Sequence, residues 1–165
     1  MIGQDLCRKL IMGDKHMEPT NNNEKKRLSR REERQQALEL VFERQFRDDS
    51  AEEAFEDALN AGKTEISDYA KKIVLGVDEH LPEIDKIIEE NLKGWKKNRI
   101  SKISLAILRI AVFEMLYIDN RELPVSVSIN EAVELTKSYS TDKDASFVNG
   151  VLGAASRTLE KSGES

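Results

Sequence analysis

One segment, residues 102–119, constrains the fold more than any other because it is apolar on nearly every side. Its apolar residues are Ile103, Leu105, Ile107, Leu108, Ile110, Val112, Phe113, Met115 and Leu116. A helix without a polar face has to be covered by other elements. This segment is also too short, and too charged, to span a bilayer. The sequence therefore predicts a central buried helix and no membrane association.

The remaining helices are predicted from apolar periodicity and from capping residues. Ser29 and Glu32 have the spacing of a capping box, in which the serine and glutamate side chains bind each other's backbone N–H groups. Four helices are expected before the central one: Ser29 to about Arg47, Ser50 to about Leu59, about Ile66 to His80, and Pro82 to Gly94.

Two helices are expected after the central one. Ser128 and Glu131 again resemble a capping box, which predicts a sixth helix from this point. Thr141 or Asp142 is expected to cap the seventh. Short loops and the lack of strand alternation predict an all-α bundle of about seven helices.

Composition excludes several classes of protein. Charged residues make up 35% and aromatic residues 5%, which favours helices over a β-sandwich. A single cysteine, Cys7, excludes a disulfide framework and suits the cytoplasm. Neither histidine, His16 or His80, has a metal ligand at a suitable spacing, and no glycine-rich phosphate loop is present. We therefore expect no enzyme activity, no metal and no cofactor.

The predicted domain organisation is simple. Residues 1–27 are expected to be a disordered N-terminal extension, 28–160 a single helical domain, and 161–165 a tail. Residues 93–102 contain five bases, no acid and no apolar period. We therefore place a break between two helical halves near 93–101.

A basic cluster lies at the start of the first helix. Residues 24–34 contain six bases and three acids, although the net charge of the chain is −5. Cations at a helix N-terminus interact unfavourably with the helix dipole and lower the stability of the helix. This pattern therefore indicates a site that binds an anion. Arg30 and Arg34 share one face. A solvated run of charge is the alternative, and Glu32 and Glu33 weaken the cluster.

The only tryptophan, Trp95, lies between bases in residues 93–102. Bases interleaved with an aromatic ring can bind single-stranded nucleic acid by phosphate contacts and stacking. Alternatively, Trp95 packs between the two helical halves. Gly150, inside the last helix, costs about 1 kcal/mol relative to alanine. This cost suggests a close approach by another helix or by RNA.

Three motifs carry a resemblance to a known family. They are Leu-Arg-Ile-Ala-Val-Phe-Glu at 108–114, Ile-Asn-Glu-Ala-Val-Glu-Leu-Thr-Lys at 129–137 after Pro124, and Phe-Val-Asn-Gly-Val-Leu at 147–152. In this order and at these spacings they resemble the NusB family of bacterial transcription antitermination factors. The arginine-rich first helix resembles the family less strongly, and the similarity covers residues 28–160.

The resemblance implies a NusB-like bundle of two perpendicular helical subdomains. It also implies binding to boxA-type single-stranded RNA of ribosomal RNA leaders, together with the ribosomal protein NusE. This assembly would join the RNA polymerase elongation complex with other Nus factors and promote processive elongation. The free protein is expected to be either a monomer or a homodimer.

The resemblance also assigns site residues. Those matching the RNA-binding positions are Arg30, Arg31, Arg34, Lys143, Phe147 and Asn149, and those matching the partner-binding positions are Phe42 and Glu114. Phe147 could instead be a core residue. Glu114, a charge on an apolar helix, needs either a partner or a salt bridge, for which Arg109 is one candidate. Arg109 itself is expected to be structural.

Two other functions remain open. The chain could be an accessory domain of an RNA-modifying system, or a helical module that binds only proteins. In the second case the arginines would be solvated charge.

Overall fold

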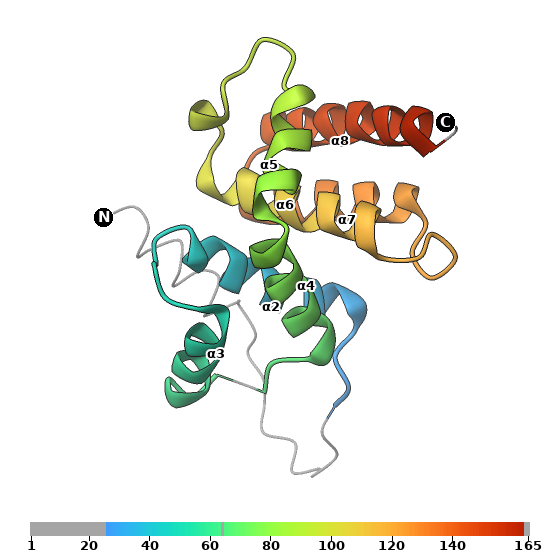
Figure 1. The fold of residues 1–165 in the computed structure, drawn as a ribbon. Helices are drawn as coiled ribbons and strands as arrows, with labels where there is room; N and C mark the ends of the chain where they lie inside the picture. Colours follow the sequence, from blue (N-terminus) through green and yellow to red (C-terminus); the bar gives the residue numbers. More distant parts are fainter. Residues whose placement is uncertain (1–25, 64, 164–165) are drawn as a thin grey trace.

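The computed structural model describes residues 26–63 and 65–163. In these residues it contains seven α-helices, one short 3-10 helix and no strand (Figure 1). They are α2 (Arg30–Arg44), α3 (Ala51–Asn60), α4 (Asp68–Glu79), α5 (Leu81–Glu90), η1 (Lys97–Arg99), α6 (Lys102–Tyr117), α7 (Val125–Tyr139) and α8 (Asp142–Gly163). The prediction of an all-α bundle is confirmed. The predicted extension, except for Lys26 and Arg27, lies outside the described residues.

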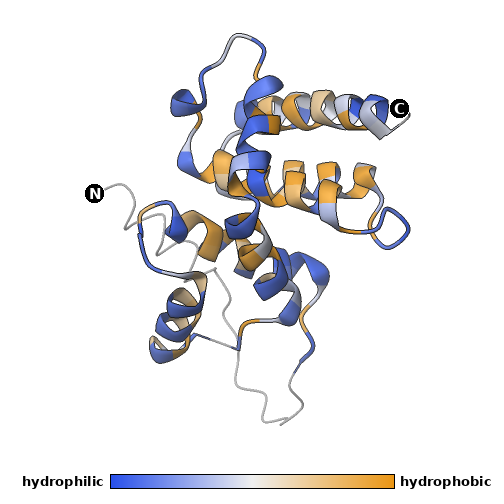
Figure 2. Ribbon diagram, in the orientation of Figure 1, coloured by the Kyte–Doolittle hydropathy of each residue, from blue (hydrophilic) through white to orange (hydrophobic). Residues whose placement is uncertain are grey.

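Helix α6 is the centre of the bundle, as its sequence predicts. Every residue from Ile103 to Glu114 is buried except Arg109. Helices α2, α4, α5, α7 and α8 all pack against it, and Figure 2 shows apolar residues concentrated on α6 and on its neighbours. Burying one large aliphatic side chain contributes about 1.5–3 kcal/mol, so this helix supplies much of the hydrophobic stabilisation.

The N-terminal caps of several helices agree with the sequence. Ser29 and Ser50 both form complete capping boxes, with Glu32 and Glu53 respectively. Thr141 caps α8, because its Oγ1 accepts a hydrogen bond of 3.1 Å from the backbone N–H of Asp144. A serine or threonine cap contributes about 1 kcal/mol, so local sequence fixes these three starts.

The predicted capping box at Ser128 and Glu131 is wrong. Helix α7 already begins at Val125, whose backbone N–H donates to Asn120 Oδ1 at 3.1 Å. Pro124, directly before it, has a fixed φ that suits entry into a helix. Ser128 is therefore inside the helix and buried. Ser128 and Glu131 make tertiary contacts instead, and these contacts account for the spacing of the two residues.

The two groups of helices that meet at α6 come from different parts of the chain. Helices α2, α3 and α4 form one group and α6, α7 and α8 the other, while α5 packs against α6 and α8. The subdomain boundary near 93–101 stays a prediction. Helix α8 extends to Gly163, so residues 161–163 are helical rather than a tail. None of the described helices is long and apolar enough to cross a membrane.

Helices α4 and α6 approach closely where Gly76 meets Phe113. A Cβ atom at Gly76 would lie 2.1 Å from Cε2 of the Phe113 ring. Gly150 differs, because a Cβ there would meet nothing within 4 Å. A close helix contact at Gly150 is therefore not found among the described residues, whereas Gly76 is required by packing.

We expect Gly76→Ala to destabilise the protein by about 1–3 kcal/mol through overpacking against Phe113. The matched control is Gly150→Ala, which should be neutral or stabilising by up to about 1 kcal/mol because alanine favours helix. Thermal unfolding followed by circular dichroism measures both. Equal midpoints for the two variants would contradict the packing role of Gly76.

Glu39 on α2 lies in a recess beside Lys63, with its side chain mostly buried. Lys63 Nζ lies 3.9 Å from Glu39 Oε2 and 3.2 Å from Glu43 Oε1. Burial raises the pKa of Glu39 from 4.5 to about 7; Glu43 adds to the rise and Lys63 opposes it. Between pH 4.5 and about 7, Glu39 is therefore protonated in the folded protein and ionised in the unfolded chain.

Because this pKa is raised on folding, the contribution of Glu39 to stability falls as pH rises from 4.5 to 7. We expect Glu39→Gln to gain stability over the wild type across this range, by about 1.4 kcal/mol per pKa unit at most. Urea unfolding at pH 5 and pH 8 measures the difference. Glu56→Gln, on the exposed side of α3, is the control, and a parallel pH response of both variants would refute the effect.

Candidate nucleic-acid interface

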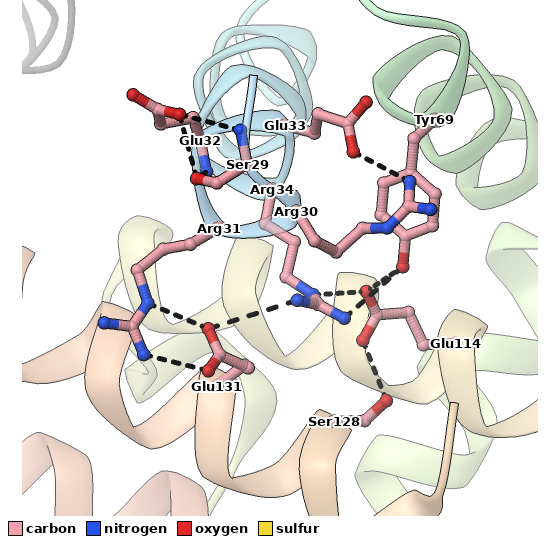
Figure 3. A network of polar contacts seen from close by, with 10 residues as sticks. All are labelled: Ser29, Arg30, Arg31, Glu32, Glu33, Arg34, Tyr69, Glu114, Ser128 and Glu131. Atoms are coloured by element: carbon pink, nitrogen blue, oxygen red, sulfur yellow. Dashed lines mark hydrogen bonds and ion pairs between the residues drawn. The ribbon is translucent and has the colours of Figure 1, made fainter. Parts of the chain in front are cut away.

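The first turn of α2 places two arginines at the surface (Figure 3). Arg30 binds Glu33 at 2.7 Å, and its guanidinium carbon lies 3.8 Å from the centre of the Tyr69 ring. Arg31 donates two hydrogen bonds, of 3.1 and 2.9 Å, to the Glu131 carboxylate of α7. The two arginine side chains are 55% and 57% exposed. Both are therefore accessible to a ligand.

The third arginine, Arg34, is buried. Its Nε lies 2.7 Å from Glu114 Oε1, and the two side chains are only 4% and 1% exposed. Glu114 accepts two further hydrogen bonds, from the Tyr69 hydroxyl at 2.6 Å and from Ser128 Oγ at 2.8 Å. Figure 3 shows these groups converging from α2, α4, α6 and α7. This carboxylate therefore joins four helices.

Glu114 takes Arg34 as its salt-bridge partner, not Arg109. Arg109 instead binds Asp85 of α5 through two hydrogen bonds of 2.8 and 2.9 Å. Asp85 also binds Lys97, at 3.2 Å. Burial raises the pKa of Asp85, but Arg109 and Lys97 outweigh it and lower the pKa overall. Arg109 therefore has the structural role expected from the sequence, at the contact between α5 and α6.

The buried network is charged, with Tyr69 as its neutral donor. Burial opposes the charged form of Arg34, but its partners, Glu114 foremost, together outweigh burial and raise the pKa of Arg34. Burial and then the charge of Glu114 raise the pKa of Tyr69. The hydrogen bonds from Arg31 lower the pKa of Glu131. At neutral pH Arg34 and Glu131 are therefore ionised and Tyr69 keeps its proton.

A second group of candidate residues lies where the segment before α6 meets the start of α8. The rings of Trp95 and Phe147 are 5.8 Å apart in an edge-to-face arrangement. Both rings line a small pocket together with Arg99, Ser104 and Lys143. Trp95 is 56% exposed, so it is not a buried anchor between two halves. Aromatic rings beside cations are the elements of a single-strand binding surface.

Apart from the buried Arg34, the residues predicted to bind RNA thus lie in two separate groups. Arg30 and Arg31 lie at the start of α2, whereas Lys143 and Phe147 lie in the first turns of α8. Helix α7 connects the two groups, since Glu131 holds Arg31 and the helix leads into α8. Asn149 is exposed on α8.

Both predicted partner-binding residues are buried. Phe42 is 2% exposed, and Glu114 is in the network described above. Phe46, one turn further along the chain, packs edge-to-face on Phe42 with ring centres 5.3 Å apart, and it is 59% exposed. The sequence interpretation overlooked Phe46, although its spacing of four residues from Phe42 was a usable signal.

These features define an all-α binding protein that presents cations, aromatic rings and amides. The described residues contain no group of three or more histidine, cysteine or acidic side chains that could hold a metal ion. The chain belongs to the NusB family, whose sequence profile matches residues 31–157. The family resemblance seen in the sequence is thereby confirmed.

Individual members of the family align with this chain over most of their own length. The transcription antitermination protein NusB of Finegoldia magna is 42% identical over 136 residues, covering 81% of this chain and 97% of that protein. A structure of T. maritima NusB superposes with a TM-score of 0.69 at 31% identity, covering 79% of this chain and 92% of the other. A crystal structure of antitermination factors NusB and NusE in complex with double-stranded RNA gives 0.67 at 28% identity, covering 78% and 96%.

We expect Arg34→Ala to destabilise the fold by about 3–5 kcal/mol, because it leaves the Glu114 carboxylate buried without its cation. Arg31→Ala is the matched control on the same helix, and its exposed ion pair should contribute far less. Urea unfolding measures both variants. Similar losses would show that the buried pair is not the stabilising contact.

Proposed function

We propose that this protein is an RNA-binding transcription antitermination factor that acts in the cytoplasm. It binds boxA-type single-stranded RNA of ribosomal RNA leaders together with the ribosomal protein NusE. With other Nus factors it then promotes processive elongation by RNA polymerase. The observation that carries the proposal is the cluster of accessible cations and rings at Trp95, Arg99, Lys143 and Phe147, in a chain of the NusB family.

The proposed RNA contacts are Arg30, Arg31, Lys143, Phe147 and Asn149. Guanidinium and ammonium groups neutralise phosphates, while an aromatic ring stacks on an unpaired base. Asn149, exposed on α8, can donate to a base edge or accept from it.

Arg34 serves the RNA site indirectly in this proposal. Its Nη1 lies 4.0 Å from Glu131 Oε2, and Glu131 holds Arg31. Arg34 therefore positions the carboxylate that orients an exposed arginine, and its own guanidinium stays in the core.

The partner surface is proposed to include Phe46, which offers an accessible ring supported by Phe42 beneath it. Glu114 supports this surface from inside, through the helices that it joins. NusE is the proposed occupant, and the complex of a related NusB with NusE and RNA supports this choice. A second copy of the chain is the alternative occupant.

The test is fluorescence anisotropy with a labelled boxA-type RNA, with and without the ribosomal partner. For single-stranded RNA the logarithm of affinity should fall with the logarithm of salt concentration by about 0.7 for each phosphate contact. A duplex of the same sequence serves as competitor. Partner binding without RNA binding would favour a protein-interaction module.

We expect the variant Arg30→Ala/Arg31→Ala/Lys143→Ala to bind RNA more weakly and to show a smaller salt slope, by about 0.7 for each phosphate that the variant no longer neutralises. The control is Lys72→Ala/Lys86→Ala, which removes two exposed bases from α4 and α5. Circular dichroism verifies folding. Unchanged affinity and slope in the triple variant would refute the assignment of these cations.

A further inference from the structure

Ser104 presents a buried hydroxyl group that no other described residue binds. It lies in the first turn of α6 and is 1% exposed. Its backbone N–H donates to Ser101 Oγ at 3.2 Å, but its own Oγ has no hydrogen-bond partner in the described part of the chain. Buried polar side-chain atoms are nearly always bonded, so such a group needs an explanation.

Ser104 lines the same pocket as Trp95 and Phe147. These two rings meet edge-to-face, with an angle of 62° between their planes. Trp95 leaves more than half of its surface exposed, although large apolar side chains are usually buried. The pocket thus has aromatic walls, and its lining includes a hydroxyl group that no described residue binds.

The described lining of this pocket also holds more cations than carboxylates. Lys143 and Arg99 line it, and Asp144 is the one carboxylate among the lining residues that the structure describes. Asp144 accepts a hydrogen bond from the Ser140 hydroxyl, and its backbone N–H is bound by Thr141. The carboxylate is therefore held in place as a fixed acceptor next to the two cations.

We propose that this pocket takes one unpaired base of the bound RNA, with Trp95 as the stacking residue and Ser104 as a residue that reads the base edge. The inference rests on the proposed function and deepens it. A base matches the pocket in three respects: a flat face for the rings, polar edge atoms for the hydroxyl and the carboxylate, and flanking phosphates for the cations. An aliphatic side chain of a protein partner would leave the Ser104 hydroxyl unpaired.

Trp95 is the only tryptophan of the chain, so its fluorescence reports on this pocket alone. A boxA-type RNA should change the emission of Trp95 on binding. In a series of RNAs that each carry one abasic nucleotide, a single position should abolish this change. That RNA should also bind the wild type roughly tenfold or more weakly, as expected when one stacked base is removed.

Two variants test the assignment in a double-mutant cycle. Trp95→Ala should weaken binding of intact RNA by a similar factor. This variant should then bind the abasic RNA and the intact RNA with equal affinity. Ser104→Ala should lose discrimination among the four bases at that position, with a smaller effect on affinity for the preferred one. Tyr117→Ala, an exposed ring at the other end of α6, is the control and should leave RNA affinity unchanged.

The outcomes separate this inference from the proposed function. If the wild type shows no salt-dependent RNA binding, the proposed function fails. If it binds RNA with the expected salt slope, but Trp95→Ala and Ser104→Ala behave as wild type at every abasic position, only the base pocket is wrong. A change in Trp95 emission with the partner protein alone, and none with RNA, would also overturn it.

Discussion

The structure depends on one buried carboxylate, that of Glu114. It lies on the central helix α6 and receives the guanidinium of Arg34 and the hydroxyls of Tyr69 and Ser128. Burying a charge is costly unless it is paired and its remaining acceptor sites are bonded. Here both oxygens are bonded, so the penalty is offset only when α2, α4, α6 and α7 are all in place. The network therefore specifies how the first group of helices is set against the second.

This geometry also determines what the first helix offers to a ligand. Arg34 is held inside, which fixes the rotation of α2 about its axis. Arg30, one turn earlier on the same face, lies over the Tyr69 ring and stays exposed, as does Arg31. Glu131 links the two regions, since it binds Arg31 and lies near Arg34. The accessible charge on α2 is thus a consequence of the buried charge beneath it.

Local sequence predicted much of the fold and less of the site. The caps at Ser29 and Ser50 and the apolar sequence of α6 act within a few residues, so they could be read directly. The burial of Arg34 could not, because it depends on a glutamate 80 positions away. The same holds for Ser128 and Glu131, whose spacing imitates a cap but arises from tertiary contacts. The family motifs identified the chain, but they do not distinguish a residue that supports the surface from one that forms it.

The exposed arginines of α2 already have carboxylate partners, Glu33 and Glu131. In the proposed RNA site, a phosphate therefore has to compete with an internal anion for each of these guanidinium groups. One isolated phosphate gains little from such an exchange, whereas a strand that touches several cations and a stacking pocket together gains from all of them. Because its arginines are already paired, the proposed RNA site favours a long strand of the right shape over small polyanions. This preference is in keeping with a chain whose net charge is −5.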